Sequence, residues 1–285
     1  MAHTSPVLEI GNFRITSVRA GSYWWDGGTF FGVVPKTLWA KTQPVDDQNL
    51  IEAGFNCFVV EDGEHRILIE TGGGVRHDDR AKARMRTPDP VRIREAVSLH
   101  GFEPETIDTV ISTHLHWDHA GGNTVDEAGH VVASMPNARY IAQRAELEHA
   151  RERHPRDSVS YRDVNYEPLL ETGQMHLIDG DAEIIPGLQL TVTPGHNRSM
   201  MIVTLRAGNE TWCHFADLVQ FAVNVTPTWV SGFDLFPLEA IDNKTRLLAQ
   251  ATSEGWWCSF GHDPVTSFAQ VEAKDGKWRT INNRT

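Results

Sequence analysis

A run of histidines and acidic residues directly after an apolar segment constrains this chain more than any other feature. Ile107–Ser112 is typical of a buried strand, and Thr113–His119, with the sequence T-H-L-H-W-D-H, follows it at once. In an extended turn His114 and His116 project to the same side. The aspartate and the last histidine of the run can then face a second ion as the chain turns. The run therefore predicts a metal site at the end of a strand.

The donor types favour a catalytic zinc-like site. Neutral imidazoles and a carboxylate suit zinc or a similar first-row ion. The three cysteines, Cys57, Cys213 and Cys258, have no C-x-x-C spacing and lie in apolar stretches. We therefore expect buried core thiols, and neither disulfides nor a closed thiolate site.

Three later residues each follow a predicted strand and can lie at the same kind of sheet edge. They are His196 in T-P-G-H, Asp217 in F-A-D and His262 in F-G-H-D. A single histidine after a strand is usually structural or solvated, and a histidine-rich run can be a surface turn or a helix cap. The combination of the run with three further candidates favours metal binding.

The pattern of the remaining chain predicts an α/β protein with two similar halves. Hairpins are predicted around Asp62-Gly63 and around Gly208-Asn209, and each is followed by a carboxylate, Glu70 or Asp217. Helical spacing is found at Val91–His100, Arg144–Arg153 and Leu238–Ser253; further strands are predicted at Phe13–Val18, Arg139–Ala142, Met175–Ile178, Leu188–Val192 and Trp256–Phe260. No linker separates these elements, so we expect one domain over residues 1–285.

Charge and composition narrow the partners. A formal charge of −12 repels polyphosphates, which argues against nucleic acid and favours a small neutral or hydrophobic substrate. The first residues lack a basic segment followed by an apolar one, and no apolar run is long enough to span a bilayer. We expect a cytoplasmic protein without membrane contact, and the sequence is compatible with a monomer or a homodimer.

The motif H-x-H-x-D-H, followed by a distant His, Asp and His, resembles the metallo-β-lactamase superfamily over nearly the whole chain. The resemblance implies an αββα four-layer sandwich with two divalent metal ions, most simply zinc, at one edge. By motif position it implies that the first ion is bound by His114, His116 and His196, the second by Asp118, His119 and His262, and both by Asp217.

Residues 26–39 resemble the D-G-G-x-x-F-G-V-V-P-K-x-L-W segment of quorum-quenching N-acyl homoserine lactonases and of methyl parathion hydrolases. Its glycines and proline are compatible with a structured loop that closes over a site. Its aromatic residues, Phe30, Phe31 and Trp39, are candidates for the substrate pocket, as is Trp229 from a later predicted loop. The alternative interpretation is that these aromatic side chains are core.

The sequence also departs from the family pattern. Glu70 stands where the family usually has Asp, so we expect it at most to orient a ligand. Ala216 replaces the usual glycine before Asp217, and Gln220 stands where some lactonases place a substrate-assisting tyrosine. A tyrosine-assisted mechanism is therefore not expected.

The remaining histidines are expected to play no part in binding metal. His214 alternates with Asp217 along the predicted strand and is expected to pack or orient. The others are expected to be solvated, and include His65, His77, His149, His154 and His176.

The expected mechanism is hydrolysis by water activated between two metal ions, with Asp118 passing a proton to the leaving group. No G-x-S-x-G motif suggests a covalent intermediate. A lactone or other carboxylic ester is the favoured substrate, with an N-acyl homoserine lactone first. The alternatives are phosphotriester hydrolysis and, less favoured, β-lactam opening. A di-iron oxidoreductase would typically carry Glu at His116, and a non-catalytic ligand-binding member would not need the full ligand set.

Overall fold

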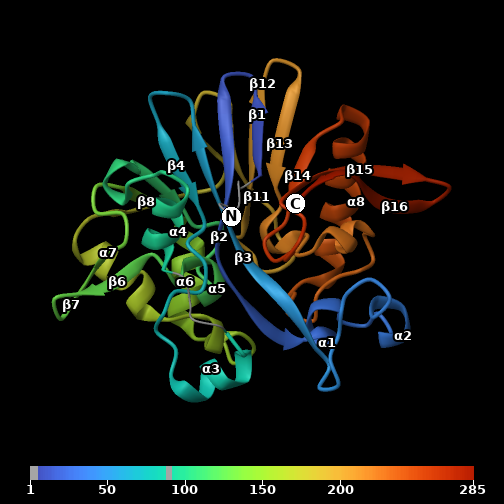
Figure 1. Ribbon diagram of the computed structural model, residues 1–285, viewed down its shortest axis with the longest axis horizontal. Coiled ribbons are helices and arrows are strands. Elements are labelled where there is room, and N and C mark those ends of the chain that lie inside the picture. Colours follow the sequence, from blue (N-terminus) through green and yellow to red (C-terminus); the bar gives the residue numbers. More distant parts are fainter. Residues whose placement is uncertain (1–5, 88–91) are drawn as a thin grey trace. The chain divides into compact units, whose positions relative to one another are not determined.

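The computed structural model describes residues 6–87 and 92–285, which form two compact units assembled from separate stretches of chain (Figure 1). The first unit comprises Met1–Ser22, Phe55–Ala83 and Thr87–Gly180; the second comprises Tyr23–Gly54, Arg84–Arg86 and Asp181–Thr285. The division falls within two long strands, β2 (Phe13–Asp26) and β3 (Leu50–Glu61). The expectation of one domain over residues 1–285 stays a prediction.

The sheet of the first unit has the strand order β1-β2-β3-β4-β5-β8-β9. Its other strands are β1 (Val7–Ile10), β4 (Arg66–Ile69), β5 (Thr109–Ile111), β8 (Arg139–Gln143) and β9 (Met175–Ile178). A separate hairpin is formed by β6 (Thr124–Glu127) and β7 (His130–Ala133), and the helices are α3 (Asp79–Met85), α4 (Ile93–Leu99), α5 (Trp117–Ala120), α6 (Arg144–Glu152) and α7 (Glu167–Glu171). Because β4 and β5 are parallel neighbours, the turns that follow them lie at the same edge.

The sheet of the second unit has the strand order β10-β11-β12-β13-β14-β15-β16. Its strands are β10 (Ala182–Ile185), β11 (Leu188–Val192), β12 (Met201–Ala207), β13 (Glu210–His214), β14 (Trp257–Ser259), β15 (Phe268–Lys274) and β16 (Lys277–Arg284). Helix α8 (Pro237–Glu254) packs against β15 (Figure 1), and the short helices α1 (Gly27–Phe31) and α2 (Lys36–Trp39) belong to the same unit. Strands β13 and β14 are parallel, so their carboxyl ends also share an edge.

The two units repeat one arrangement. In the first, the antiparallel pair β3–β4 is followed, after α4, by β5 parallel to β4. In the second, the antiparallel pair β12–β13 is followed, after α8, by β14 parallel to β13. The prediction of two similar halves, each with a hairpin before a carboxylate, therefore matches the observed topology.

Buried apolar side chains surround β13 and β14 in the core of the second unit. Cys213 on β13 and Cys258 on β14 are register partners inside a buried apolar cluster that also contains Phe215, Leu248 and Phe260. All three cysteines are buried thiols, as predicted. Burial of these apolar side chains, roughly 2 kcal/mol for each large one, stabilises the edge at which β13 and β14 end.

Most predicted elements are present. The predicted helix Val91–His100 corresponds to α4, although Val91 lies outside the described residues. The segment predicted as a loop over residues 26–39 instead forms α1 and α2; the Asp26 carboxylate caps α1 by accepting a hydrogen bond from the Gly28 amide at 2.7 Å. Among the described helices, none is both long and apolar enough to cross a membrane.

Candidate metal centre

Three buried side chains of the first unit gather where β4 and β5 end. Glu70 follows β4, and His114 and His119 belong to the turn after β5. Each offers one ligand atom, and these atoms lie within 4.8 Å of one another. The rings of the two histidines are 4.1 Å apart between centroids. Imidazoles and carboxylates both occur around first-row metal ions, and the hydrogen bonds of each group decide whether it is free to bind an ion or orients one that does.

Close backbone packing fixes the turn that carries His119. A Cβ on Gly121 would lie 2.3 Å from the Trp117 carbonyl oxygen and 2.4 Å from that of Gly73, so this position excludes any side chain. The Thr71 amide and hydroxyl both donate to the His119 carbonyl oxygen, at 2.8 and 3.0 Å. The turn is therefore held rigidly against the turn that follows β4.

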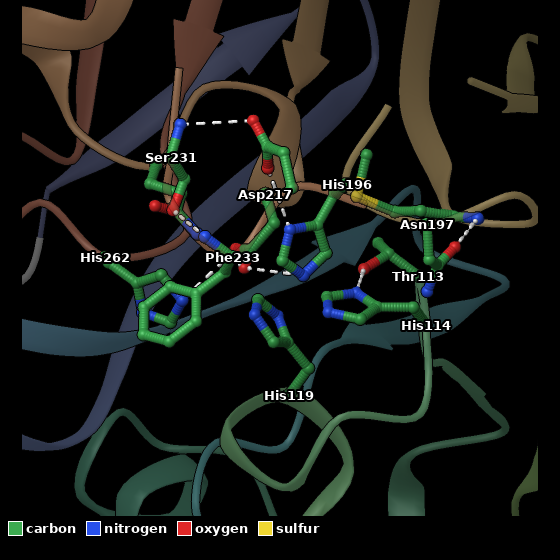
Figure 2. A network of polar contacts seen from close by, with 12 residues as sticks. Thr113, His114, His119, His196, Asn197, Asp217, Ser231, Phe233 and His262 are labelled. Atoms are coloured by element: carbon green, nitrogen blue, oxygen red, sulfur yellow. Dashed lines mark hydrogen bonds and ion pairs between the residues drawn. The ribbon is translucent and has the colours of Figure 1, made fainter. Parts of the chain in front are cut away.

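Hydrogen bonds determine which nitrogen of His114 and His119 carries the proton. The Thr113 hydroxyl donates its only hydrogen to Glu70 Oε1, so its oxygen accepts from His114 Nδ1 at 3.1 Å (Figure 2). His119 Nδ1 lies 3.3 Å from the same Glu70 oxygen, which can only accept. In both histidines Nδ1 is thus protonated and Nε2 is the nitrogen that can bind a metal.

His116 is held by its surroundings in the first unit. Glu146, buried in the first turn of α6, accepts from the Leu115 amide and from the Tyr161 hydroxyl, each at 3.0 Å. The Tyr161 ring packs edge-on against His116 with 4.7 Å between centroids. A single carboxylate therefore restrains the backbone between the first two histidines of the motif and the ring beside the second.

Asp118 lies in the first turn of α5 and is partly exposed. Burial lowers the pKa of the nearby Arg162 guanidinium, and the Asp118 charge opposes this effect. The proton-transfer role of Asp118 stays a prediction.

In the second unit two buried histidines flank Asp217. His196 Nε2 lies 3.4 Å from Asp217 Oδ2, and His262 Nε2 lies 3.1 Å from Asp217 Oδ1, so both rings point toward this carboxylate (Figure 2). His196 Nδ1 donates to Asp234 Oδ1 at 3.1 Å, and His262 Nδ1 donates to the Gly54 carbonyl oxygen at 3.0 Å. Because both partners can only accept, Nε2 is again the nitrogen available to a metal.

Local backbone geometry places these side chains. Gly195 has a φ of 153°, and a Cβ there would lie 2.8 Å from Ala240 Cα of α8, so only glycine allows His196 this approach to the helix. Asp217 follows Ala216, which is left-handed with a φ of 47°. The His262 amide donates to the Gln220 carbonyl oxygen at 2.9 Å, which ties the two ligand-bearing turns together.

A small cavity, whose volume of about 150 Å³ includes space open to solvent, lies beside Asp217. Two of the predicted pocket residues, Phe30 and Trp229, lie on its wall, together with Leu218, Gln220, Asn224 and Ser231. The other two, Phe31 and Trp39, are fully buried and stack on each other with centroids 5.1 Å apart. They are not among the residues lining this cavity, and their contact with substrate stays a prediction.

Two of the remaining histidines are not as solvated as the sequence predicts. His77 is buried, because its Nε2 contacts the Gly73 carbonyl oxygen at 2.9 Å and its ring packs edge-on against Trp117. Burial lowers its pKa. His149 is partly buried, with its Nε2 2.8 Å from Asp157 Oδ2. His214 is buried against Ser259, as expected for a packing role.

The donor chemistry of these turns fits metal ions. Buried histidines are costly unless their polar atoms find partners, and here Nδ1 is committed to an acceptor in each of four histidines. The Nε2 atoms of His196 and His262 are directed toward Asp217, as expected for rings prepared to bind a cation. Glu146 and Asp234 are functional candidates that the sequence did not reveal.

Comparison with known proteins agrees with this chemistry. Residues 54–262 match the family model of the metallo-beta-lactamase superfamily. The chain is 31% identical over 232 residues to an N-acyl homoserine lactonase of Bacillus thuringiensis, covering 73% of this chain and 80% of that protein. It is 29% identical over 237 residues to an N-acyl homoserine lactonase of Bacillus cereus, covering 75% and 83% of the two chains.

Solved structures show the same fold. A probable metal-dependent hydrolase from Staphylococcus aureus superimposes with a TM-score of 0.88 at 26% identity, covering 97% of this chain and 98% of that one. A dizinc quorum-quenching lactonase superimposes with a TM-score of 0.80 at 19% identity, covering 99% and 98%. The predicted α/β class and metallo-β-lactamase fold are confirmed, and this chain belongs to the metallo-beta-lactamase superfamily, a family of hydrolases.

Proposed function

We propose that this protein is a metal-dependent lactonase whose substrates include N-acyl homoserine lactones. Its family is hydrolytic, and several relatives at about 30% identity are N-acyl homoserine lactonases. In this proposal seven residues bind two divalent ions, zinc in the simplest case. They are His114, His116, Asp118, His119, His196, Asp217 and His262.

The observation that carries the proposal is that four histidines hold the same ring nitrogen, Nδ1, in a hydrogen bond. In His114 and His119 of the first unit, and in His196 and His262 of the second, Nδ1 is held by an acceptor and Nε2 is left as the ligating atom. Asp217 presents a different oxygen to each of its two imidazole neighbours, an arrangement that suits a carboxylate shared by two ions. This preparation is characteristic of metal sites and is not needed by a protein that only binds an organic ligand.

Two such ions, when bound, supply an activated water and polarise the oxygen of the scissile group. The chain itself contributes positioning, a water-poor site and proton transfer. We assign the proton transfer to Asp118, which lies in the first turn of α5 and is partly exposed. It can therefore pass a proton to the leaving group of a bound substrate. Phe30 and Trp229, on the wall of the cavity beside Asp217, provide apolar surface for an acyl chain.

The test is a panel of substrates given to zinc-loaded protein, with proton release as the readout. N-acyl homoserine lactones should be opened in a chelator-sensitive way, well above a paraoxon-type triester and a chromogenic β-lactam. Turnover of the triester alone would contradict the lactonase proposal and indicate a phosphotriesterase. Binding of zinc without turnover of any of the three substrates would also contradict the proposal and indicate a ligand-binding member of the family.

A pair of histidine variants separates metal binding from a general effect of substitution. His116→Ala should lose lactone opening and bind less zinc, whereas His176→Ala, at an exposed position on β9, should retain both. Full activity in His116→Ala would contradict the proposed ligand set.

A further inference from the structure

Gln220 is a buried amide that lines the cavity together with Asp217. Its side chain is 3% exposed, and its Nε2 donates to Asp217 Oδ2 at 2.8 Å. A carboxylate can only accept hydrogen bonds, so the amide nitrogen must face Asp217 and the amide oxygen must face another direction. The orientation of this amide is therefore determined by its partner.

The amide oxygen, Gln220 Oε1, is buried and has no hydrogen-bond partner among the described residues. A buried acceptor without a donor is unfavourable, and native proteins normally leave one only where a ligand, a water or a functional requirement accounts for it. Gln220 thus has a hydrogen-bonding capacity that its protein neighbours do not use.

The neighbouring polar side chains of the cavity are already committed. The Ser231 hydroxyl donates to the Thr29 carbonyl oxygen at 3.0 Å, and Asn224 Oδ1 accepts from the Phe221 amide at 3.1 Å. Phe30, Leu218 and Trp229 supply the apolar part of the wall. An incoming hydrogen-bond donor would therefore find its unused acceptor in Gln220 Oε1.

We propose that Gln220 determines specificity: its Oε1 accepts a hydrogen bond from a substrate N–H, which selects lactones that carry an acylamino group beside the ring. This inference rests on the proposed lactonase function, because it places the ring next to Asp217. The amide then has two tasks. Its nitrogen fixes the Asp217 carboxylate, and its oxygen distinguishes an acylamino lactone from a lactone without an N–H.

The experiment compares two lactones that differ by one group: N-hexanoyl homoserine lactone and the same molecule with CH₂ in place of N–H. For the zinc-loaded wild type, kcat/KM should be about five- to tenfold higher for the N–H compound, the range expected for one hydrogen bond. In Gln220→Met, which keeps the length but removes the acceptor, the two values should agree within about twofold. Zinc content, measured in parallel, reports any effect transmitted through Asp217.

Gln250→Met is the matched control, because the Gln250 amide also donates to a carboxylate, Glu254 at 2.9 Å, but on the outer side of α8. It should keep the wild-type preference. If Gln220→Met keeps that preference as well, the inference is wrong although lactonase activity stands. If the wild type opens neither lactone, the lactonase proposal fails. Calorimetric binding of N-hexanoyl-homoserine and its CH₂ analogue to zinc-loaded protein then decides the role of Gln220, and equal affinities in wild type and Gln220→Met would overturn it.

Discussion

The turns after β4 and β13 use the same backbone device to present carboxylates with different surroundings. Each follows the second strand of an antiparallel hairpin, and each contains a non-glycine residue in the left-handed region, Glu70 with a φ of 63° and Ala216 with a φ of 47°. In the first turn the left-handed residue carries the carboxylate itself. In the second, the carboxylate of Asp217 comes one residue later.

The partners of the two carboxylates differ in kind. Glu70 Oε1 accepts from the Thr113 hydroxyl and lies 3.3 Å from His119 Nδ1, the nitrogen that does not bind metal in our proposal. Asp217 instead faces the Nε2 atoms of two histidines, one on each oxygen. A carboxylate on Nδ1 orients a ligand, whereas a carboxylate among Nε2 atoms is placed as a ligand. Topological similarity therefore does not imply the same role.

The largest effect is expected from Asp217→Asn. Replacing the carboxylate by a neutral amide should reduce bound zinc from two ions per chain to one or fewer and remove detectable lactone opening, because both of its oxygens face candidate ligand histidines. Zinc content by mass spectrometry and circular dichroism of the same sample measure metal and fold together. Two tightly bound ions in a folded variant would contradict a bridging role for Asp217.

A smaller effect is expected from Glu70→Gln. The amide oxygen can still accept from Thr113, but the negative charge beside His119 Nδ1 is lost. Zinc affinity should fall by about 10- to 100-fold, as for other groups that orient a ligand, while two ions still bind at saturating zinc. Competition with a chromophoric chelator measures this. Loss of a whole ion, as in Asp217→Asn, would make Glu70 a ligand and remove the difference between the turns.

A third prediction concerns Lys244, which lies near one of the two carboxylates that anchor the histidines. Glu146 in the first unit accepts from an amide and a hydroxyl, whereas Asp234 in the second lies near Lys244, whose ammonium is buried and donates to the Trp229 carbonyl oxygen at 2.6 Å. Burial lowers the pKa of Lys244 to about 7, and the Asp234 charge opposes this effect.

Between this value and the ordinary pKa of 10.5, the unfolded chain binds more protons than the folded one, so stability rises with pH. This group alone should raise the free energy of unfolding by roughly 2 kcal/mol from pH 7 to pH 9. Urea titrations at both values should show the rise in wild type and in Lys274→Met, an exposed control, and not in Lys244→Met. An equal rise in Lys244→Met would assign it to another group.

Local signals allowed much of the fold to be predicted from sequence, and polar edge strands were missed. Asp62-Gly63 and Gly208-Asn209 lie between apolar strands, and both hairpins form. Asp275-Gly276 carries the same type of turn signal, with φ values of 53° and 71°, but the mostly polar sequence of β16 concealed the β15–β16 hairpin. Alternation of apolar and polar residues indicates a strand with one buried face. An exposed edge strand such as β16 need not show this alternation.

For the site, the sequence indicated the candidate ligands and an orienting role for Glu70, whereas Glu146 and Asp234 could not be predicted. Asp234 is 38 residues from His196, and Glu146 is 31 residues from Leu115, and no sequence spacing relates either carboxylate to its partner. Each becomes identifiable only when tertiary packing buries it beside a motif residue. His77 was misjudged for the same reason, because its burial depends on Trp117.

The smallest effect is expected from replacing Ala216, the left-handed residue of the turn after β13, by glycine. Ala216→Gly should relieve about 1 kcal/mol of left-handed backbone strain. It also removes a fully buried methyl group, which destabilises the folded state by about 0.8 kcal/mol. The greater backbone entropy of glycine in the unfolded chain lowers the free energy of unfolding by roughly a further 0.5 to 1 kcal/mol. These terms nearly cancel, so the free energy of unfolding in urea should change by less than about 1 kcal/mol.

Ala216→Val should instead destabilise by more than about 2 kcal/mol, because a β-branched residue is strongly disfavoured at positive φ and the site is packed on all sides. The two variants together separate backbone conformation from packing. If Ala216→Gly lowers the free energy of unfolding as much as Ala216→Val does, packing of the buried methyl group, and not the left-handed backbone, determines which residue is tolerated before Asp217. The left-handed conformation would then not be an energetic constraint common to the two carboxylate turns.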